Sequence, residues 1–343
     1  MRNRRDRRNP NNTVYFITNR TKEGLPFMAR FYMRLILIGI MAKAQSLYHV
    51  NICHFLWMLN HYHIILAGEG KNVSKFVGYM QSEVAKAVKK LTPIYGKEIG
   101  NVWETRFKEQ KICTAEDAIR MIVYIYLNPV TAGLVSKAQK WKGCSSYKMY
   151  LTGSYTYEGQ KLPLKLLKRL PIYITDKLDL RLAENFRKLA TDKNILRLMP
   201  NMWKKCFEES KDWSDEYIYE RIIKAIKEGE EEAKRIHGGK FMGMKAVQKQ
   251  PLNKVYKPKK KEKTPYLICG DDKQRILEIK SYKDFCKSCC EAYALWKKGI
   301  YTAAYVYGAY RPGMSIMGDL RPKELTKKCK KKERVACLGL AAA

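Results

Sequence analysis

Residues 53–65 read Cys-His-Phe-Leu-Trp-Met-Leu-Asn-His-Tyr-His-Ile-Ile, and this stretch decides the fold. Aromatic and β-branched residues on both sides of Leu-Asn predict a strand, a tight turn and a second strand. Side chains alternate along a strand, so His61 and His63 are expected on one side of the sheet, with Tyr62 and Ile64 on the core side. Two adjacent imidazoles on a rigid sheet are the beginning of a divalent-metal site. The alternative is a pair of half-buried surface histidines.

A helix is predicted over residues 114–128. Thr114 is a suitable N-cap, and Asp117 supplies the carboxylate at the third helical position. Helical spacing places four polar side chains on one face: Asp117, Arg120, Tyr124 and Asn128. The opposite face is apolar and is expected to pack on the sheet.

The two tyrosines of this helix are therefore not equivalent. Tyr126 falls on the apolar side and is expected in the core, whereas Tyr124 has polar neighbours. Asn128 lies one turn after Tyr124, where its amide oxygen is a candidate third metal ligand. Pro129 follows directly and disfavours helical geometry at Asn128, which weakens that assignment.

The order of these motifs resembles that in REP-associated tyrosine transposases, which are single-tyrosine HUH transposases of bacterial insertion sequences. The resemblance covers residues 13–152 best and extends more weakly to about residue 322. Two departures are visible, because Leu59 stands where many members have proline and Thr131 where many have arginine. The matching segments are Val14–Arg20, Met58–His63, Trp103–Phe107, Tyr124–Val135, and Trp141 with Ser145–Tyr147.

The resemblance implies a protein that cuts single-stranded DNA beside a hairpin and joins it again. Tyr124 would be the nucleophile and would hold a 5′-phosphotyrosine. Phenolate is a better leaving group than a serine alkoxide, so the intermediate is readily reversed. His61, His63 and Asn128 would hold Mg²⁺ or Mn²⁺, because oxygen ligands complete the shell and a structural zinc site would need more His or Cys.

The charge of the chain agrees with a polyanionic partner. Lys and Arg number 67 against 33 Asp and Glu, which gives a net charge of +34 and a sequence pI of about 9.7. Such an excess predicts nucleic-acid binding that weakens as salt rises. Arg106 could contact phosphate beside Trp103, which could stack on unpaired bases. Alternatively, Arg106 is an edge-strand arginine and Trp103 packs in the core. The candidate DNA-binding residues are Arg106, Trp103, Arg120, Lys86, Lys89 and Lys90.

The predicted fold class is α+β, with a ferredoxin-like antiparallel sheet in βαββαβ order, helices on one face of it, and a mostly helical basic C-terminal extension. HUH nucleases share this arrangement. The expected strands are 13–19, 50–58, 61–67 and 102–111, and the expected helices are 27–44, 73–91 and 114–128.

Five regions are predicted along the chain: a basic disordered arm (1–12), the catalytic domain (13–152), a helical extension (153–250), a basic linker (251–265) and a small C-terminal region with a basic tail (266–343). Residues 212–240 are expected as two helices, or as one interrupted at Gly229. From its charge alone, the extension is expected to bind a DNA stem or target.

The ten cysteines lack the compact even spacing of a disulfide scaffold, which favours a reduced, cytoplasmic protein. Because DNA is its expected partner, we expect it to be associated with the nucleoid. The apolar run 35–41 is too short to span a bilayer, and no secretory signal is recognised. Cys286, Cys289 and Cys290 lack a second pair at a good distance, so structural zinc is not favoured.

Three functions compete: an active transposase, a non-catalytic or domesticated single-stranded nucleic-acid-binding protein, and a replication- or relaxase-type HUH nickase. The single usable tyrosine and the Asn128-Pro129-Val130 ending favour the first. The resemblance is also compatible with a homodimer, so Tyr124 could serve the histidine pair of its own chain or of a partner.

Overall fold

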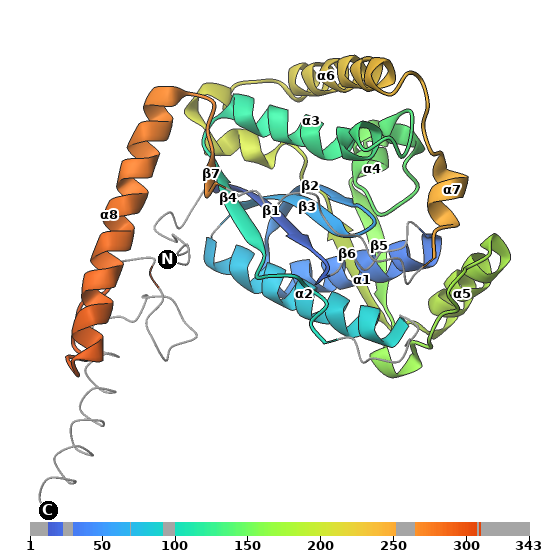
Figure 1. Cartoon of the computed structure of the whole chain (residues 1–343), viewed down its shortest axis with the longest axis horizontal. Helices are drawn as coiled ribbons and strands as arrows, with labels where there is room; N and C mark the ends of the chain where they lie inside the picture. Colours follow the sequence, from blue (N-terminus) through green and yellow to red (C-terminus); the bar gives the residue numbers. More distant parts are fainter. Residues whose placement is uncertain are drawn as a thin grey trace, which may run out of the picture. The chain divides into compact units, whose positions relative to one another are not determined.

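A computed structural model describes residues 13–22, 30–68, 70–91, 100–251, 265–306 and 309 (Figure 1). The predicted arm (1–12), most of the predicted linker and the basic tail lie outside the described residues. The chain divides into two compact units. One comprises residues 12–68 and 72–270, so the predicted extension (153–250) shares a unit with the predicted catalytic region. The other comprises residues 1–11, 69–71 and 271–343.

The first unit is built on a five-stranded sheet in the order β2-β3-β1-β4-β7, in which the first four strands are antiparallel neighbours. β7 pairs in parallel with β4, so the sheet is mixed, and the prediction of a wholly antiparallel sheet was wrong at this edge. β7 has only two residues and lies far downstream of β4, so no local sequence pattern predicts this pairing. The bounds are β1 Thr13–Arg20, β2 Asn51–Trp57, β3 His61–Gly68, β4 Lys108–Ile112 and β7 Leu267–Ile268.

The strand expected over residues 102–111 is shorter than predicted. Residues 102–107 form a loop before β4, and an isolated bridge between Thr21 and Trp103 holds it beside the end of β1. The side chain of Asn19 donates to the carbonyl of Thr105 (3.1 Å), which fixes the loop a second time.

One face of the sheet is covered by α1 (Phe31–Tyr48) and α2 (Gly70–Leu91), which pack on Tyr62, Ile64 and Leu66 of β3. The other face is covered by α3 (Ala115–Thr131), which packs on Val14, Phe16 and Ile65. The prediction of helices on one face was therefore wrong. Both faces of the central strands are apolar, as expected of strands buried on both sides.

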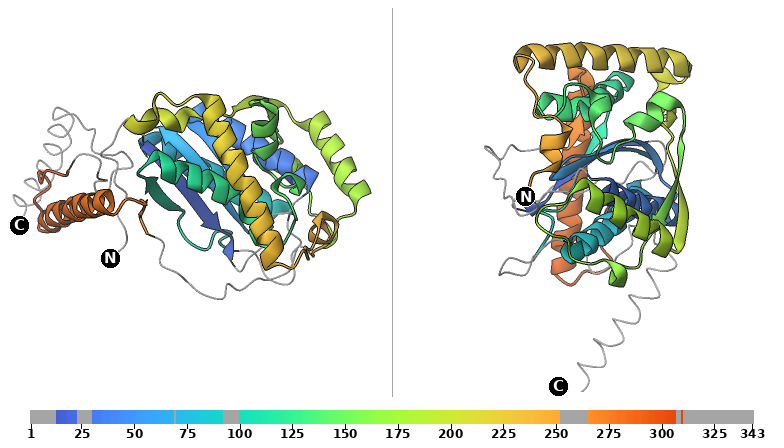
Figure 2. Two further views of the ribbon diagram at one scale, coloured as in Figure 1. Left: turned by 90° about the horizontal axis from the view of Figure 1, so that it is seen from above. Right: turned by 90° about the vertical axis from the view of Figure 1, so that its right-hand side faces the viewer.

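α6 (Asp215–Ile236) lies on the outer side of α3, and the views of Figure 2 show the two helices stacked over the sheet. It is one continuous helix, so the prediction of two helices, or of one interrupted at Gly229, was wrong. A Cβ at Gly229 would lie 2.1 Å from Leu127 Cδ1 of α3. The glycine therefore lets the two helices approach each other.

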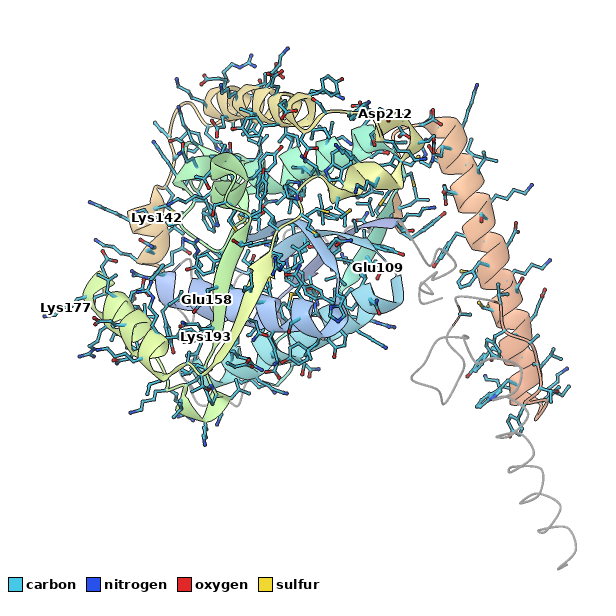
Figure 3. All side chains as sticks on the ribbon, turned by 180° about the vertical axis from the view of Figure 1, so that it is seen from behind. Glu109, Lys142, Glu158, Lys177, Lys193 and Asp212 are labelled. Carbon is cyan, nitrogen blue, oxygen red and sulfur yellow. The ribbon has the colours of Figure 1, made fainter. Side chains whose placement is uncertain are left out.

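The region after residue 153 contains a two-stranded antiparallel sheet that the prediction of a mostly helical extension missed. β5 (Thr156–Lys161) pairs with β6 (Asp192–Arg197), and residues 162–191 lie between the two strands. A Cβ at Gly39 of α1 would lie 1.9 Å from the carbonyl oxygen of Gln160, so α1 and β5 are in backbone contact. Glu158 of β5 and Lys193 of β6 have their charged groups 3.8 Å apart (Figure 3).

The remaining elements of this unit are short, apart from α5. They are η2 Ala138–Lys140, α4 Tyr147–Thr152, η3 Leu164–Leu166, α5 Asp176–Leu189, η4 Met202–Cys206, η5 Glu208–Ser210 and α7 Met244–Gln248.

The second unit contains α8 (Asp272–Lys297), whose N-cap Asp271 accepts a hydrogen bond from the backbone N–H of Gln274 (2.6 Å). Phe285 and Cys289 of α8 form a small buried cluster with Ala309. Among the helices that the structure describes, none has the length and apolarity needed to cross a membrane.

Candidate active site

The histidine pair lies on β3, on the side of the sheet that α3 covers. The rings of His61 and His63 are 4.9 Å apart between centroids, and His63 stacks on Phe16 of β1 at 5.3 Å. Tyr62 and Ile64 are fully buried on the opposite side of the strand. The predicted alternation along this strand is confirmed.

Tyr124 reaches the histidine pair from α3. Its ring centroid lies 5.4 Å from that of His63, and it also meets Phe16 edge-on. The side chain of Tyr124 is 46% exposed, whereas that of Tyr126 is 1% exposed. The prediction that Tyr126 belongs to the core and Tyr124 does not is confirmed.

Asn128 completes the cluster from the next turn of α3. The helix continues through Pro129 to Thr131, so the predicted loss of helical geometry at Asn128 was wrong. The Thr131 hydroxyl donates to the carbonyls of Leu127 and Asn128 (both 3.2 Å), which helps to hold this final turn. The Asn128 amide nitrogen lies 3.4 Å from His63 Nε2.

The protonation of the pair follows from its burial. Burial lowers the pKa of His61 to about 4, assisted by the nearby charge of Arg20 and opposed by a hydrogen bond with Asn128. Burial also lowers the pKa of His63 well below 6.5, with smaller contributions from His61 and Arg20. Both imidazoles are therefore neutral near pH 7, which is the form that binds metals.

The histidine nitrogens and the amide oxygen of this cluster are suitable ligands for a divalent cation. His61 Nδ1 lies 2.7 Å from the side-chain oxygen of Asn60. An amide oxygen only accepts, so Nδ1 carries the proton and Nε2 keeps its lone pair. His63 Nδ1 is buried and has no hydrogen-bond partner among the described residues. The Asn128 amide can turn its oxygen toward the same point, because the oxygen and nitrogen are exchanged by a flip.

The resulting donor set would be two imidazoles and one carboxamide. Among the described residues, no group of three or more His, Cys, Asp or Glu side chains is arranged to hold a metal. Any cation here would therefore have incomplete protein ligation and would keep positions for phosphate or water oxygens.

Sequence reasoning missed Arg20, the residue of β1 that pairs with His61. Thr18 pairs with His63 in the same register, so both β1 residues share a sheet face with the histidines. Arg20 is half-buried, and its charge acts on both imidazoles. Alternation along β1 groups Phe16, Thr18 and Arg20 on one face, but only the pairing with β3 brings that face to the histidines.

The predicted DNA-contact residues do not form one group. Arg120 precedes Tyr124 by one turn and is exposed, but it forms an ion pair with Asp117 at 2.5 Å. Arg106 is exposed on the loop beside the end of β1. Trp103 packs edge-on against Tyr62 at 5.7 Å and donates its indole N–H to a backbone carbonyl of α2, so packing accounts for it.

The three predicted lysines lie on α2, and therefore on the side of the sheet away from Tyr124. Lys86, Lys89 and Lys90 are all exposed near the end of that helix. The structure does not bring them together with the histidine pair.

α3 is fixed from its outer side at both ends. In its first turn, Glu116 forms a bidentate ion pair with Arg221 of α6 (2.7 and 2.8 Å). At its other end, His237 Nε2 lies 3.1 Å from the carbonyl oxygen of Thr131. Arg221 in the second turn of α6 and His237 directly after that helix therefore help to hold the helix that carries Tyr124 and Asn128.

Asp117, predicted on the polar face, is buried and accepts hydrogen bonds from Thr114 Oγ1 (2.8 Å) and from the backbone N–H of Gly270 (3.0 Å). It joins the start of α3 to the segment after β7. Its role is to hold the fold rather than to contact a ligand.

No protein-family model matches the chain, and no curated protein matches it significantly. Among solved structures, that of a REP-associated tyrosine transposase bound to a REP hairpin is similar at 19% identity. The aligned region covers 45% of this chain and 85% of that one, with a TM-score of 0.37. A likeness this low supports no inference about function, which rests instead on the geometry above.

Proposed function

We propose that the protein cleaves and rejoins single-stranded DNA at hairpins, with Tyr124 as the nucleophile, as in a single-tyrosine HUH transposase. The observation that carries the proposal is the meeting of Tyr124 and Asn128, one turn apart on α3, with His61 and His63 on β3. Helical spacing groups Tyr124 with Asn128, strand spacing groups His61 with His63, and the fold brings these two pairs of side chains into contact. Packing alone does not require the two pairs to meet.

The fold supports the same class. The strand and helix order from β1 to β4 is βαββαβ, and the sheet order β2-β3-β1-β4 agrees with a ferredoxin-like arrangement of the HUH nuclease type. All four site residues belong to one chain, which favours a nucleophile that serves the histidine pair of its own chain. A homodimer is then not needed to complete the site.

The proposed step is an in-line displacement at phosphorus. The phenol oxygen of Tyr124 forms a bond to the scissile phosphate, the bond from phosphorus to the 3′-oxygen breaks, and the 3′-oxygen takes up a proton. The DNA 5′ end is then held as a phosphotyrosine. Attack by a 3′-hydroxyl on the same phosphorus reverses the reaction and returns the phenol.

Two local effects act in opposite directions on the pKa of the Tyr124 phenol. Burial raises the pKa of Tyr124 above its usual value, and its hydrogen bond with Asn128 opposes that rise. The exposed part of the side chain gives the phenol proton a route to water. A divalent cation such as Mg²⁺ or Mn²⁺, bound by His61, His63 and Asn128, would polarise the scissile phosphate and offset charge on the departing oxygen.

Arg20 provides a fixed positive charge beside the histidines, where the negative phosphate would lie. The strong positive charge of the whole chain supports a DNA partner. Such a substrate implies a cytoplasmic, nucleoid-associated protein.

The test is incubation with a pool of labelled single-stranded hairpins, with Mn²⁺ or Mg²⁺ and with chelator. Wild type is compared with Tyr124→Phe and with the control Tyr217→Phe, which removes the same atom from a side chain that is also 46% exposed but lies on α6. We expect a covalent protein–DNA product that needs metal, persists in the control and is absent from Tyr124→Phe. Binding without any such product would instead identify a non-catalytic DNA-binding protein.

A further inference from the structure

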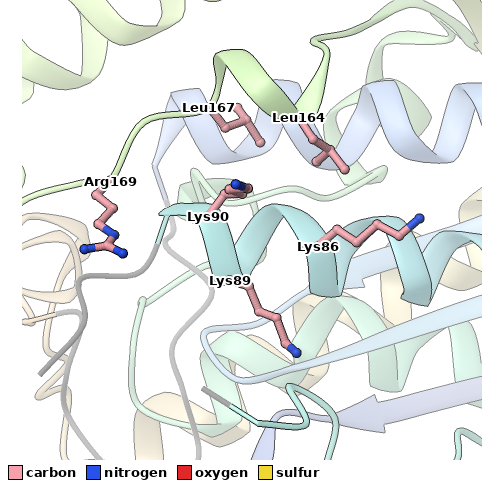
Figure 4. Close-up of a pocket in the computed structure, with 6 residues that line it drawn as sticks. All are labelled: Lys86, Lys89, Lys90, Leu164, Leu167 and Arg169. Carbon is pink, nitrogen blue, oxygen red and sulfur yellow. The ribbon is translucent and has the colours of Figure 1, made fainter. Parts of the chain in front are cut away.

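A pocket of about 490 Å³ opens between the end of α2 and η3, in the unit that contains the sheet. Figure 4 shows the lysines extending from α2, Leu164 from η3, and Leu167 and Arg169 from the segment that follows. The described residues that line it are Lys86, Lys89, Lys90, Leu164, Leu167 and Arg169.

The charge in this pocket is largely uncompensated. Lys86 pairs with Glu83 at 2.8 Å, but the same carboxylate is shared with Lys161. Within the described part of the chain, no carboxylate lies within ion-pairing distance of Lys89, Lys90 or Arg169. None of the described lining residues is acidic. Like charges that line one pocket repel each other, and a bound anion would relieve that repulsion.

The pocket is fixed by the fold. The backbone N–H of Leu170 donates to the carbonyl of Leu91 (2.9 Å), which ties the segment after η3 to the last residue of α2. Leu167 and Leu170 are buried on either side of Arg169. Lysines in a last helical turn often only complement the helix dipole, which would explain Lys89 and Lys90. That account does not explain an arginine arriving from a different segment.

The lining chemistry selects one kind of anion. Arg and Lys bind phosphate oxygens, and arginine can do so through two parallel hydrogen bonds. Unpaired bases are bound mainly by stacking on aromatic rings, and no aromatic side chain is among the described residues that line the pocket. The pocket therefore suits a sugar–phosphate backbone better than splayed bases, which favours paired DNA.

The pocket is also separate from the candidate active site. α2 packs on the face of the sheet that carries Tyr62 and Ile64, whereas His63 and Tyr124 lie on the other face. A DNA strand at Tyr124 can reach Lys89 only by passing around the sheet. The phosphates bound in the pocket are therefore not those that would be cleaved.

We propose that this pocket binds backbone phosphates of the paired stem of a hairpin, as a second DNA contact remote from Tyr124. The proposal rests on the proposed function for the identity of the DNA. It extends that function by assigning different parts of the hairpin to the two faces of the sheet.

The test uses the full chain in which Lys89, Lys90 and Arg169 are all replaced by Gln. The matched control replaces three exposed cations of α5 by Gln: Lys177, Arg181 and Lys188. Binding to a hairpin, a blunt duplex and an unstructured single strand is measured between about 50 and 200 mM salt. Thermal unfolding checks that both variants remain folded.

We expect the pocket variant to bind the hairpin and the duplex roughly 10- to 100-fold more weakly, with a salt slope smaller by up to about 3. The affinity of the pocket variant for the single strand should stay within a few-fold of wild type. The control variant should stay within a few-fold of wild type for all three probes. Equal losses in both variants, or an equal loss on the single strand, would overturn the proposal.

A second measurement separates this proposal from the proposed function. It compares covalent-product formation by wild type with the duplex affinity of the pocket variant. If wild type forms no product while the pocket variant still loses duplex affinity, the proposed function fails and the pocket assignment stands.

Discussion

The hydroxyl of Tyr126 belongs to a buried hydrogen-bond network. The loss of stability caused by removing this hydroxyl can be calculated. The hydroxyl lies 2.7 Å from His54 Nδ1 and 2.9 Å from Ser146 Oγ, while His54 Nε2 lies 3.0 Å from the carbonyl oxygen of Pro200. A carbonyl only accepts, so Nε2 carries the proton of His54 and Nδ1 accepts from the phenol. Burial lowers the pKa of His54 to about 3, which keeps this tautomer neutral.

Tyr126→Phe keeps the ring and removes both hydrogen bonds. His54 Nδ1 is then a buried acceptor without a donor, which costs about 1–3 kcal/mol. For a unit of this size each kcal/mol lowers the unfolding midpoint by about 2–4 °C, so we expect a fall of roughly 2–12 °C. The total stability of a typical domain is about 5–15 kcal/mol, so the variant should still fold.

Tyr124→Phe is the matched comparison, because it removes the same atom two residues away on the same helix. Its side chain is 46% exposed, so unfolding in urea should change by less than about 0.5 kcal/mol. Product formation should show the reverse order: lost in Tyr124→Phe and retained in Tyr126→Phe well below its midpoint. Equal destabilisation by the two substitutions would refute the assignment of Tyr126 to the core network, and product formation by Tyr124→Phe would refute the assignment of Tyr124 to chemistry.

Three further predictions follow from the same structure. The pKa values of His54 (about 3) and His61 (about 4) are below 6.5 in the folded chain, so only the unfolded chain takes up these protons at mildly acid pH. Stability should be complete above about pH 6.5 and fall by up to about 1.4 kcal/mol per histidine per pH unit toward pH 4, and identical urea midpoints at pH 7.5 and pH 5 would contradict this. Gly39→Ala should destabilise by about 1–3 kcal/mol or more, because its Cβ would lie 1.9 Å from a backbone oxygen of β5, whereas Gly78→Ala, with no atom within 4 Å of its Cβ, should stabilise α2 by about 0.5–1 kcal/mol. Arg20→Gln should slow covalent-product formation roughly 10- to 100-fold with partial recovery in Arg20→Lys, and an unchanged rate in Arg20→Gln would remove this residue from the chemistry.

The local part of the candidate site was predictable from sequence because each element has its own period. Two-residue spacing is enough to put His61 and His63 on one face of a strand, and four-residue spacing puts Tyr124 and Asn128 on one face of a helix. The meeting of the two faces came from the resemblance rather than from either period. The prediction for Asn128 was wrong because Pro129 takes only one N–H donor from the helix, while the Thr131 hydroxyl bonds to the carbonyls of Leu127 and Asn128 in the last turn.

The non-local part was not predictable. Arg20 faces His61 only through the register of β1 on β3, which no single segment encodes. β5 reads Thr-Tyr-Glu-Gly-Gln-Lys and lacks the apolar alternation of a strand. It pairs with the distant strand β6, and Gly159 and Gly39 allow it to lie against the backbone of α1, a contact between distant parts of the chain.

The position of α6 changes how the C-terminal half of the chain can be tested. Ile218, Ile222 and Ile226 of this helix are at most 1% exposed and belong to the core that contains α3. Burying three such side chains contributes about 5–9 kcal/mol, which is comparable to the whole stability of a domain.

Removing residues 206–343 would remove this buried face and would also leave Glu116 of α3 without its Arg221 partner. A shortened chain that failed to bind DNA would therefore report a lost fold. Exchanges of exposed charges, which leave this core intact, are the experiments that can separate DNA binding by the extension from its support of the helix that carries Tyr124.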